Sequence, residues 1–229
     1  MKKSEQPSKR FYDNKKLLLE LVPLVLVIAT FIIALFVHPI LPDKIPIHWD
    51  ASGVANGFSG RNGIFVIPII FLIVTALLFI LPLMEVFRDN MLKIYKQYYI
   101  FKIIFSVFFT LLFVFTLLPN FGYNINVAYA VIMMIALMFI GLGFILPKLK
   151  RNFMFGIRTG WTLSSDVVWN KTHKVGGVLF ALIGVITIAL LFALKLEILF
   201  FVFIGLTLLA SLILVIYSYY LFKKLGKNL

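Results

Sequence analysis

The sequence predicts an all-α fold, a polytopic bundle of about six transmembrane helices. The chain of 229 residues is 62% hydrophobic and only 14% charged, whereas a soluble domain carries roughly a quarter charged residues. Its apolar residues gather in six blocks, each long enough to cross a bilayer, which takes about 20 residues. Nearly all Lys and Arg residues lie in the tails and in alternate connections between the blocks.

The six blocks follow one another along the chain, separated by short polar segments. The first is expected to be a retained signal anchor, because its apolar run exceeds the roughly 7–15 residues of a signal peptide and no small-residue cleavage site follows it. Proline within a span is tolerated where neighbouring helices satisfy the freed carbonyl. The predicted spans are Leu17–Val37, Ile64–Met84, Ile100–Leu118, Val127–Pro147, Gly177–Leu194 and Ile198–Tyr220.

Basic residues predict the orientation of the spans. All but three of the 22 Lys and Arg residues lie in the two tails, in the second and fourth connections, or, for Lys102, close behind the second connection; the exceptions are Lys44, Arg61 and Lys195. Because Lys and Arg are enriched in cytoplasmic segments, both termini are expected inside. The predicted parts are a basic tail (1–16), four spans with an outer loop at 38–63 (17–147), a cytoplasmic connection with a short amphipathic helix (148–176), and two spans with a basic tail (177–229).

The charge balance and the absence of Cys narrow the functional classes. A net charge of +13 can indicate nucleic-acid binding, but this charge lies between apolar blocks, so no direct nucleic-acid binding is expected. A chain without Cys has no disulfide, thiolate nucleophile or thiolate metal site. No cofactor is expected.

Ionisable residues of the predicted spans are expected near their ends, where long side chains reach water. Transporters and ion pathways usually need carboxylates or His at depth in the membrane. The placement near the ends therefore argues against transport. The residues concerned are Glu20, Glu85, Lys102, Lys195 and Glu197.

The outer connection, residues 38–63, reads HPILPDKIPIHWDASGVANGFSGRNG. Its prolines favour extended backbone, its alternating apolar residues suggest a short strand, and its glycines predict turns. Long patterned connections are usually functional, so a binding role is expected; the alternative is a solvated loop anchored at the lipid headgroups by Trp49. The candidate residues are Pro42, Ile45, Pro46, Ile47, His48, Trp49 and Gly53.

Three side chains of the outer connection, Asp43, His48 and Asp50, are of types that bind metals. They have no spacing signature, so no metal site is predicted, and activity is expected to survive chelation.

The inner connection reads RNFMFGIRTGWTLSSDVVWNKTHKVGG from residue 151 to residue 177. N-cap hydroxyls followed by Asp166 predict a short helix from about Ser165 to Lys174, ended by Gly176–Gly177. Trp169 and His173 share one face of that helix. Two roles remain open, an interfacial helix resting on anionic lipid with Trp161 and Trp169 at the bilayer interface, or a docking surface for a cytoplasmic partner.

No catalytic arrangement is predicted. His173 is expected inside and His38 and His48 outside, separated by roughly 30 Å of hydrocarbon. The sequence contains no HExxH, GxSxG or phosphate-loop motif.

The two connections resemble conserved motifs of the SdpI family of bacterial membrane proteins. The inner one is similar to the pattern G-hydrophobic-R-T-P-W-T-L followed by W and T-H, and departs from it at Gly160, where members have Pro. The outer one resembles the family's Pro-rich first loop through Pro42, Ile45, Pro46, His48 and Gly53. The matching residues of the inner connection are Gly156, Arg158, Thr159, Trp161, Thr162, Leu163, Trp169, Thr172, His173 and Gly176.

The resemblance implies a bacterial cell-membrane protein of immunity or toxin sensing, acting by binding rather than catalysis. Its expected partners are the lipid bilayer, a secreted peptide toxin outside and a cytoplasmic transcriptional repressor inside. The alternatives are a small-molecule or lipid transporter or exporter accessory, and a membrane enzyme.

Overall fold

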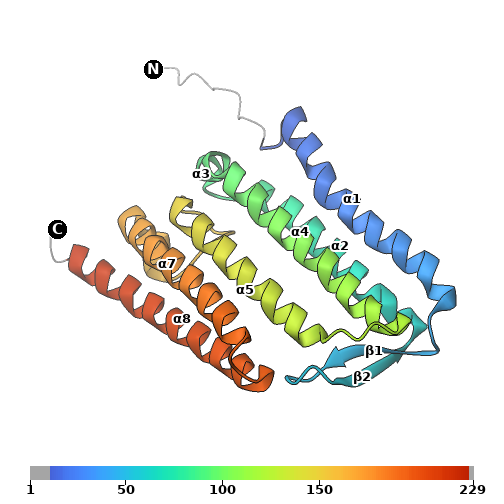
Figure 1. Cartoon of the computed structure of the whole chain (residues 1–229). Helices are drawn as coiled ribbons and strands as arrows, with labels where there is room; N and C mark the ends of the chain where they lie inside the picture. Colours follow the sequence, from blue (N-terminus) through green and yellow to red (C-terminus); the bar gives the residue numbers. More distant parts are fainter. Residues whose placement is uncertain (1–10, 227–229) are drawn as a thin grey trace.

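The computed structural model describes residues 11–226 and consists of a bundle of long helices with one small sheet (Figure 1). Six of the described helices are long and apolar enough to cross a membrane, as the hydrophobic blocks predict, and the chain is a multi-pass membrane protein. The long helices are α1 (Asn14–Val37), α2 (Val66–Ile80), α4 (Tyr95–Leu117), α5 (Val127–Ile145), α7 (Asp166–Leu191) and α8 (Leu196–Gly226); α3 (Arg88–Lys93) and α6 (Gly160–Ser164) are short.

Proline sets the C-terminal ends of four of the spans. A proline has no N–H to donate and its ring clashes with the carbonyl four residues earlier, so an α-helix cannot continue through it undisturbed. Each of these helices passes into a short 3₁₀ turn with Pro in its first two positions. The turns are η1 (His38–Ile40) after α1, η3 (Leu81–Met84) after α2, η4 (Leu118–Phe121) after α4 and η5 (Leu146–Lys148) after α5.

Helices α5 and α7 approach each other closely because small residues face each other between them. A Cβ atom on Gly143 would lie 2.8 Å from the carbonyl oxygen of Gly177, and one on Gly184 would lie 2.5 Å from the carbonyl oxygen of Ala136. Small residues allow helix backbones to pack tightly in lipid, where the hydrophobic effect does not drive association. Gly143, Gly177 and Gly184 therefore serve the close packing of these two helices.

The two ends of the bundle differ in charge and in structure. The start of α1, helix α3 and the end of α8 lie at one end, and the strands lie at the other (Figure 1). We call these the basic end and the hairpin end. Of the described Lys and Arg residues, only Lys44, Arg61 and Lys195 belong to segments at the hairpin end. Five residues that entered the orientation argument, Lys2, Lys3, Lys9, Arg10 and Lys227, lie outside the described residues.

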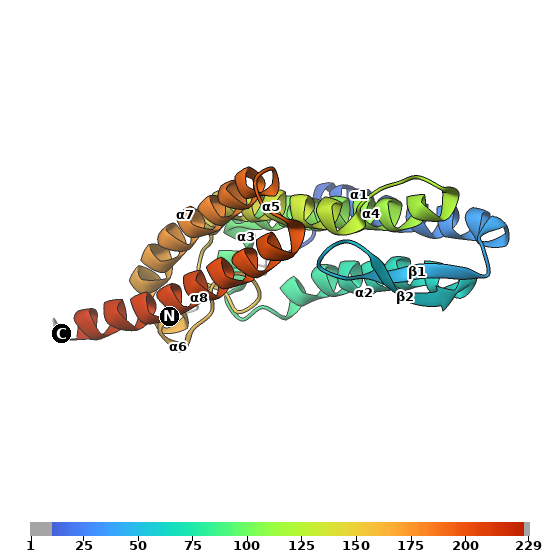
Figure 2. The same ribbon diagram turned by 60° about the horizontal axis from the view of Figure 1, so that its bottom comes forward.

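The outer connection forms a β-hairpin, which an all-α description omits. Strand β1 (Lys44–Trp49) pairs antiparallel with β2 (Ala55–Gly60), with irregular register between Pro46 and Trp49. The extended backbone expected near Pro46 is therefore present. Gly53 occupies the turn with a φ of +88°, but Gly57 and Gly60 lie within β2, so their prediction as turn residues was wrong. The strand pairing fixes their backbone more strongly than glycine's turn preference. In Figure 2 the hairpin lies beside α2.

The short helix predicted for the inner connection is part of a longer one. Helix α7 begins at Asp166, as the N-cap signal predicts, with Ser165 accepting from the Val168 N–H. It then continues through Gly176 and Gly177 to Leu191, so the expected end at these glycines was wrong. A Cβ on Gly177 would lie 2.6 Å from Pro147 Cγ. These glycines serve close helix packing rather than termination.

Two ionisable residues expected to reach water are buried instead. Glu20 of α1 and Lys102 of α4 form an ion pair whose side chains are 10% and 3% exposed. Tyr95 donates a hydrogen bond to Glu20 Oε1 at 3.1 Å, and the Lys102 ammonium lies 5.2 Å from the centre of the Tyr98 ring. The partners come from helices distant in sequence, so the pairing is invisible in the local pattern. It also removes the argument against transport that relied on their exposure.

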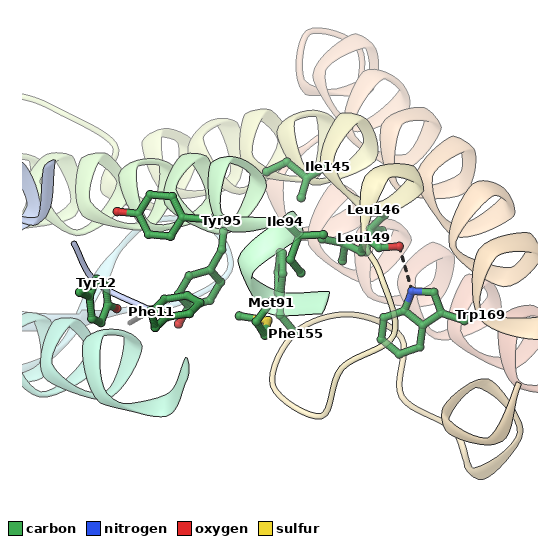
Figure 3. Packing of buried hydrophobic residues seen from close by; sticks show 11 residues of the cluster. Phe11, Tyr12, Met91, Ile94, Tyr95, Ile145, Leu146, Leu149, Phe155 and Trp169 are labelled. Carbon is green, nitrogen blue, oxygen red and sulfur yellow. Dashed lines mark hydrogen bonds between the residues drawn. The ribbon is translucent and has the colours of Figure 1, made fainter. Parts of the chain in front are cut away.

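The ion pair adjoins the largest buried cluster, which lies at the basic end and connects the segment before α1 with α3, α4, α5 and α7. Phe11 and Tyr12 pack before α1, and the cluster continues through α3 and α4 to Trp169 of α7 (Figure 3). Its remaining members are Met91, Ile94, Tyr95, Tyr98, Ile145, Leu146, Leu149 and Phe155.

Breaking the ion pair should destabilise the protein more than removing both charges. We expect Lys102→Met to leave Glu20 buried without its counter-ion and to lower stability by about 3–5 kcal/mol. Thermal unfolding in detergent measures this as a fall in Tm. The double change Glu20→Leu with Lys102→Met should recover most of the loss, and Lys96→Met, at an exposed position of α4, should change little. Equal Tm values for the single and double variants would contradict the pairing.

Candidate functional site

The inner connection is a folded loop built around the buried side chain of Asn152. Its Oδ1 atom accepts from the N–H groups of Met154 at 2.9 Å and Phe155 at 2.6 Å, and its Nδ2 donates to the carbonyls of Lys150 and Phe155. One side chain thus satisfies four backbone groups, which would otherwise be costly to bury. Sequence reasoning missed Asn152, because a single Asn in a connection has no distinguishing spacing.

Glu85 joins this loop to the connection between α2 and α3. Its two carboxylate oxygens accept from the N–H groups of Phe87 at 2.8 Å and Phe153 at 2.9 Å. The side chain is buried, contrary to the expectation that Glu85 reaches water. The two partners explain this, since a carboxylate that accepts backbone N–H bonds is stabilised out of bulk solvent.

His173 and Trp169 hold the loop against α7. The Nε2 atom of His173 lies 2.9 Å from the amide nitrogen of Ile157 and accepts its proton, while Nδ1 lies 2.8 Å from the Trp169 carbonyl. We assign the neutral tautomer with the proton on Nδ1, because a carbonyl only accepts. The Trp169 indole donates to the Leu149 carbonyl at 3.0 Å (Figure 3).

The burial of these two side chains corrects their predicted roles. Trp169 and His173 are both 0% exposed, and their rings stack 4.0 Å apart. The prediction that they share a helix face is confirmed, but that face points into the protein. Neither residue lies on a surface that lipid or a cytoplasmic partner can contact. Trp161 is partly exposed and packs on Tyr219 of α8, with 5.1 Å between the centres of the two rings.

Gly156 is required where the loop passes His173. Its φ of +125° is unfavourable for any residue with a side chain, and a Cβ there would lie 2.5 Å from His173 Nε2. Next in the loop, exposed Arg158 donates to the Phe153 carbonyl. Arg158 thus bonds to a carbonyl of its own loop.

The threonines of the motif begin α6 and connect it to α8. Thr159 and Thr162 form a capping box, and the Thr162 hydroxyl also donates to the Ile157 carbonyl at 2.9 Å. The Thr159 hydroxyl lies 3.1 Å from that of Ser218 in α8. Thr172 is buried in α7, and its hydroxyl has no hydrogen-bond partner among the described residues.

At the hairpin end, the candidate residues divide between a buried base and an exposed face. Ile45 is 2% exposed and packs in a cluster with Leu41, Ile64 and residues of α1 and α4. Ile47 is 48% exposed, Trp49 and Pro46 are partly exposed, and Pro42 is exposed. Ile45, Ile47 and Trp49 nevertheless line one small hollow, while their exposure differs from one residue to the next.

The tip of the hairpin is fixed to the start of α5. Asn126 caps that helix by accepting from the Tyr129 N–H at 3.0 Å, and its Nδ2 donates to the Ser52 carbonyl at 3.2 Å. A Cβ on Gly53 would lie 2.2 Å from Asn126 Oδ1. Hydrogen bonds from the Ser52 hydroxyl and the Val54 N–H hold the pKa of the Asp50 carboxyl below its ordinary value. The turn therefore keeps its charged acceptor at neutral pH.

The three candidate metal ligands of the hairpin have separate partners. Asp43 pairs with Arg61 at 2.8 Å, His48 Nδ1 lies 2.5 Å from Asn56 Oδ1, and Asp50 binds its own turn. Within residues 11–226, no group of three or more His, Cys, Asp or Glu side chains is placed to hold a metal ion.

Comparisons with known proteins match both connections. The model of the SdpI/YfhL protein family matches residues 148–218, which include the folded loop, α7 and most of α8. This part of the chain is therefore similar to that family. A second model, described as a domain of unknown function (DUF1648), matches residues 25–72 and so includes the hairpin.

A curated relative of this chain is the Immunity protein SdpI of Bacillus subtilis (strain 168). The two are 26% identical over 206 residues, covering 90% of this chain and 97% of the relative. No solved structure matches the chain.

The two glycines of the family motif should respond in opposite ways to substitution. Gly156→Ala should destabilise the protein strongly, because the new Cβ is strained and meets His173. Gly160 is the first residue of α6 and has open space around it, so Gly160→Pro, the residue typical of the family, should raise stability by about 0.4–1 kcal/mol. Thermal unfolding of both variants tests this. A tolerated Gly156→Ala would contradict the packing of the loop on His173.

Proposed function

We propose that this protein is a membrane immunity protein, which protects the cell that makes it from a secreted antimicrobial peptide by binding that peptide. The observation that carries the proposal is the match to the Immunity protein SdpI, which runs through both connections and nearly the full length of both chains. The shared length matters because the hairpin end and the basic end are then both within the compared region.

Binding without chemistry is supported by how the polar groups are used. The side chains of His173, Asn152 and Glu85 bond to backbone groups of the inner connection. The exposed apolar side chains of the hairpin, Val54 and Phe58, are instead available for a partner. The hairpin is therefore the proposed contact for the peptide.

A cytoplasmic repressor, if captured, would contact the basic end. The proposed surface consists of the exposed residues Phe153 and Val167 with the neighbouring cations Arg158 and Lys171. This surface takes the place of the Trp169 and His173 face as the candidate docking surface, because both of those side chains are buried. Apolar residues bordered by positive charge favour an acidic protein surface.

The proposal places the basic end in the cytoplasm. Because the sequence has no Cys, a single introduced thiol reports one position. Cys at Val54, on the exposed tip of the hairpin, should react with an impermeant maleimide in intact cells. Cys at exposed Asn170, near the start of α7, should react only after the cells are permeabilised. The reverse pattern would contradict the orientation.

Protection should depend on the exposed face of the hairpin. We expect Val54→Ala with Phe58→Ala to reduce the survival of a sensitive host exposed to the peptide, at unchanged protein level and Tm, because these side chains contribute apolar contact area. The matched control is Phe153→Ala with Val167→Ala at the basic end, which should protect like the unmodified protein. If the unmodified protein protects against no secreted peptide of its own organism, the immunity proposal fails.

A further inference from the structure

A large apolar cavity lies beneath the hairpin, between helices α2, α4, α5 and α8. Its volume is about 640 Å³, within the range of sites for small molecules and cofactors. Its walls come from the hairpin-end turns of α2, α5 and α8 and from the last turns of α4. Residues that illustrate its character are Ile67, Leu112, Val131, Ile135 and Phe203.

Polar groups are confined to one end of this cavity. The end of the cavity beneath the hairpin is lined by His48, Trp49 and Asp50, and Thr116 of α4 also contributes to the lining. A hollow of about 50 Å³ adjoins it, sharing Trp49 and Thr116, and is lined by Asn120. The buried Oδ1 of Asn120 has no hydrogen-bond partner in the described chain. A matching ligand is an amphiphile with a long apolar body and a polar head.

The cavity is continuous with the surface that faces the hydrocarbon of the bilayer. Val66 and Ile70 of α2 and Phe200 and Ile204 of α8 line the cavity and are also exposed. On α5 the lining extends from Val127 to Ile135, which corresponds to a depth of roughly 13 Å at 1.5 Å per residue. That depth is about half of a hydrocarbon core of about 30 Å, so the cavity spans one leaflet.

The lateral opening of the cavity favours a lipid chain as its occupant. The lining residues of α2 and α8 are exposed toward the hydrocarbon, so the surrounding leaflet supplies acyl chains to the cavity at high concentration. An extended acyl chain is narrow and apolar, which suits walls of aliphatic and aromatic side chains.

We propose that the cavity is a specific phospholipid site, which takes one acyl chain of a lipid from the hairpin-end leaflet between α2 and α8. The chain lies along the apolar walls, and the polar head lies under the hairpin beside Trp49. The bound lipid fills the space between α2 and α8 and supports the hairpin from below.

Trp49 allows the site to be tested by fluorescence. The full-length protein with Trp161→Phe is purified in detergent and titrated with phosphatidylglycerol carrying bromine on its acyl chains, since bromine quenches indole on contact. Fully buried Trp169 serves as an internal reference. We expect quenching of Trp49 that saturates at one lipid per protein, is absent with unbrominated lipid and is lost when Trp49→Phe is added.

Two alanines give a matched pair of variants. Ala128 lines the cavity, so Ala128→Phe should fill it and weaken saturable quenching at least tenfold. Ala76 of α2 is exposed outside it, so Ala76→Phe should bind like the parent. Val131→Phe is a second filling variant, used if Ala128→Phe does not fold by size-exclusion chromatography and thermal unfolding.

Quenching that rises without saturation and equally in all variants would reflect bulk lipid and overturn the site. An unchanged affinity in both filled variants would do the same. If the unmodified protein binds no lipid saturably but both filled variants lose protection against the peptide, the cavity belongs to the peptide and the lipid proposal fails.

Discussion

The hydrogen bonds that close the inner connection hold the basic end of the molecule together. His173 accepts from the Ile157 N–H, Trp169 donates to the Leu149 carbonyl, and Asn152 satisfies four backbone groups within the loop. Irregular backbone beside a bilayer is stable only when protein supplies its partners. Since α5 enters this loop, α7 leaves it and α8 contacts its threonine cap, the position of three spans depends on the same set of side chains. The motif is therefore first a folding element, since most of its side chains make contacts within the loop or with α7.

The hairpin end follows a different plan. There the chain leaves α1 through a proline-ended turn, forms two paired strands, and is fixed at its base by Ile45 and at its tip by Asn126. This arrangement leaves Val54 and Phe58 exposed above and an apolar cavity below. A partner outside the cell and a lipid within the membrane would thus contact opposite sides of one small sheet. The proposed contact for a cytoplasmic protein lies at the far end, so loss of one contact need not remove the other.

Hydrophobic blocks were sufficient to predict the spans, because lipid leaves few alternatives for a run of some 20 apolar residues. The N-cap before Asp166 was likewise predicted correctly from local pattern. What escaped prediction depends on partners far along the chain. Glu20 and Lys102 are 82 residues apart, and Glu85 binds the amide of Phe153. Trp169 resembles an interfacial anchor in sequence, and only the path of the loop over α7 shows that its indole is enclosed.

The central claim, that the inner connection is an ordered part of the fold held by His173, is tested most directly by amide hydrogen exchange. In the unmodified protein in detergent, peptides covering residues 149–157 should exchange nearly as slowly as those from the middle of α7. His173→Ala should accelerate exchange in that loop while peptides from α1 and α2 stay protected. Fast exchange of the loop in the unmodified protein, or a loop unaffected by His173→Ala in a folded variant, would contradict the account.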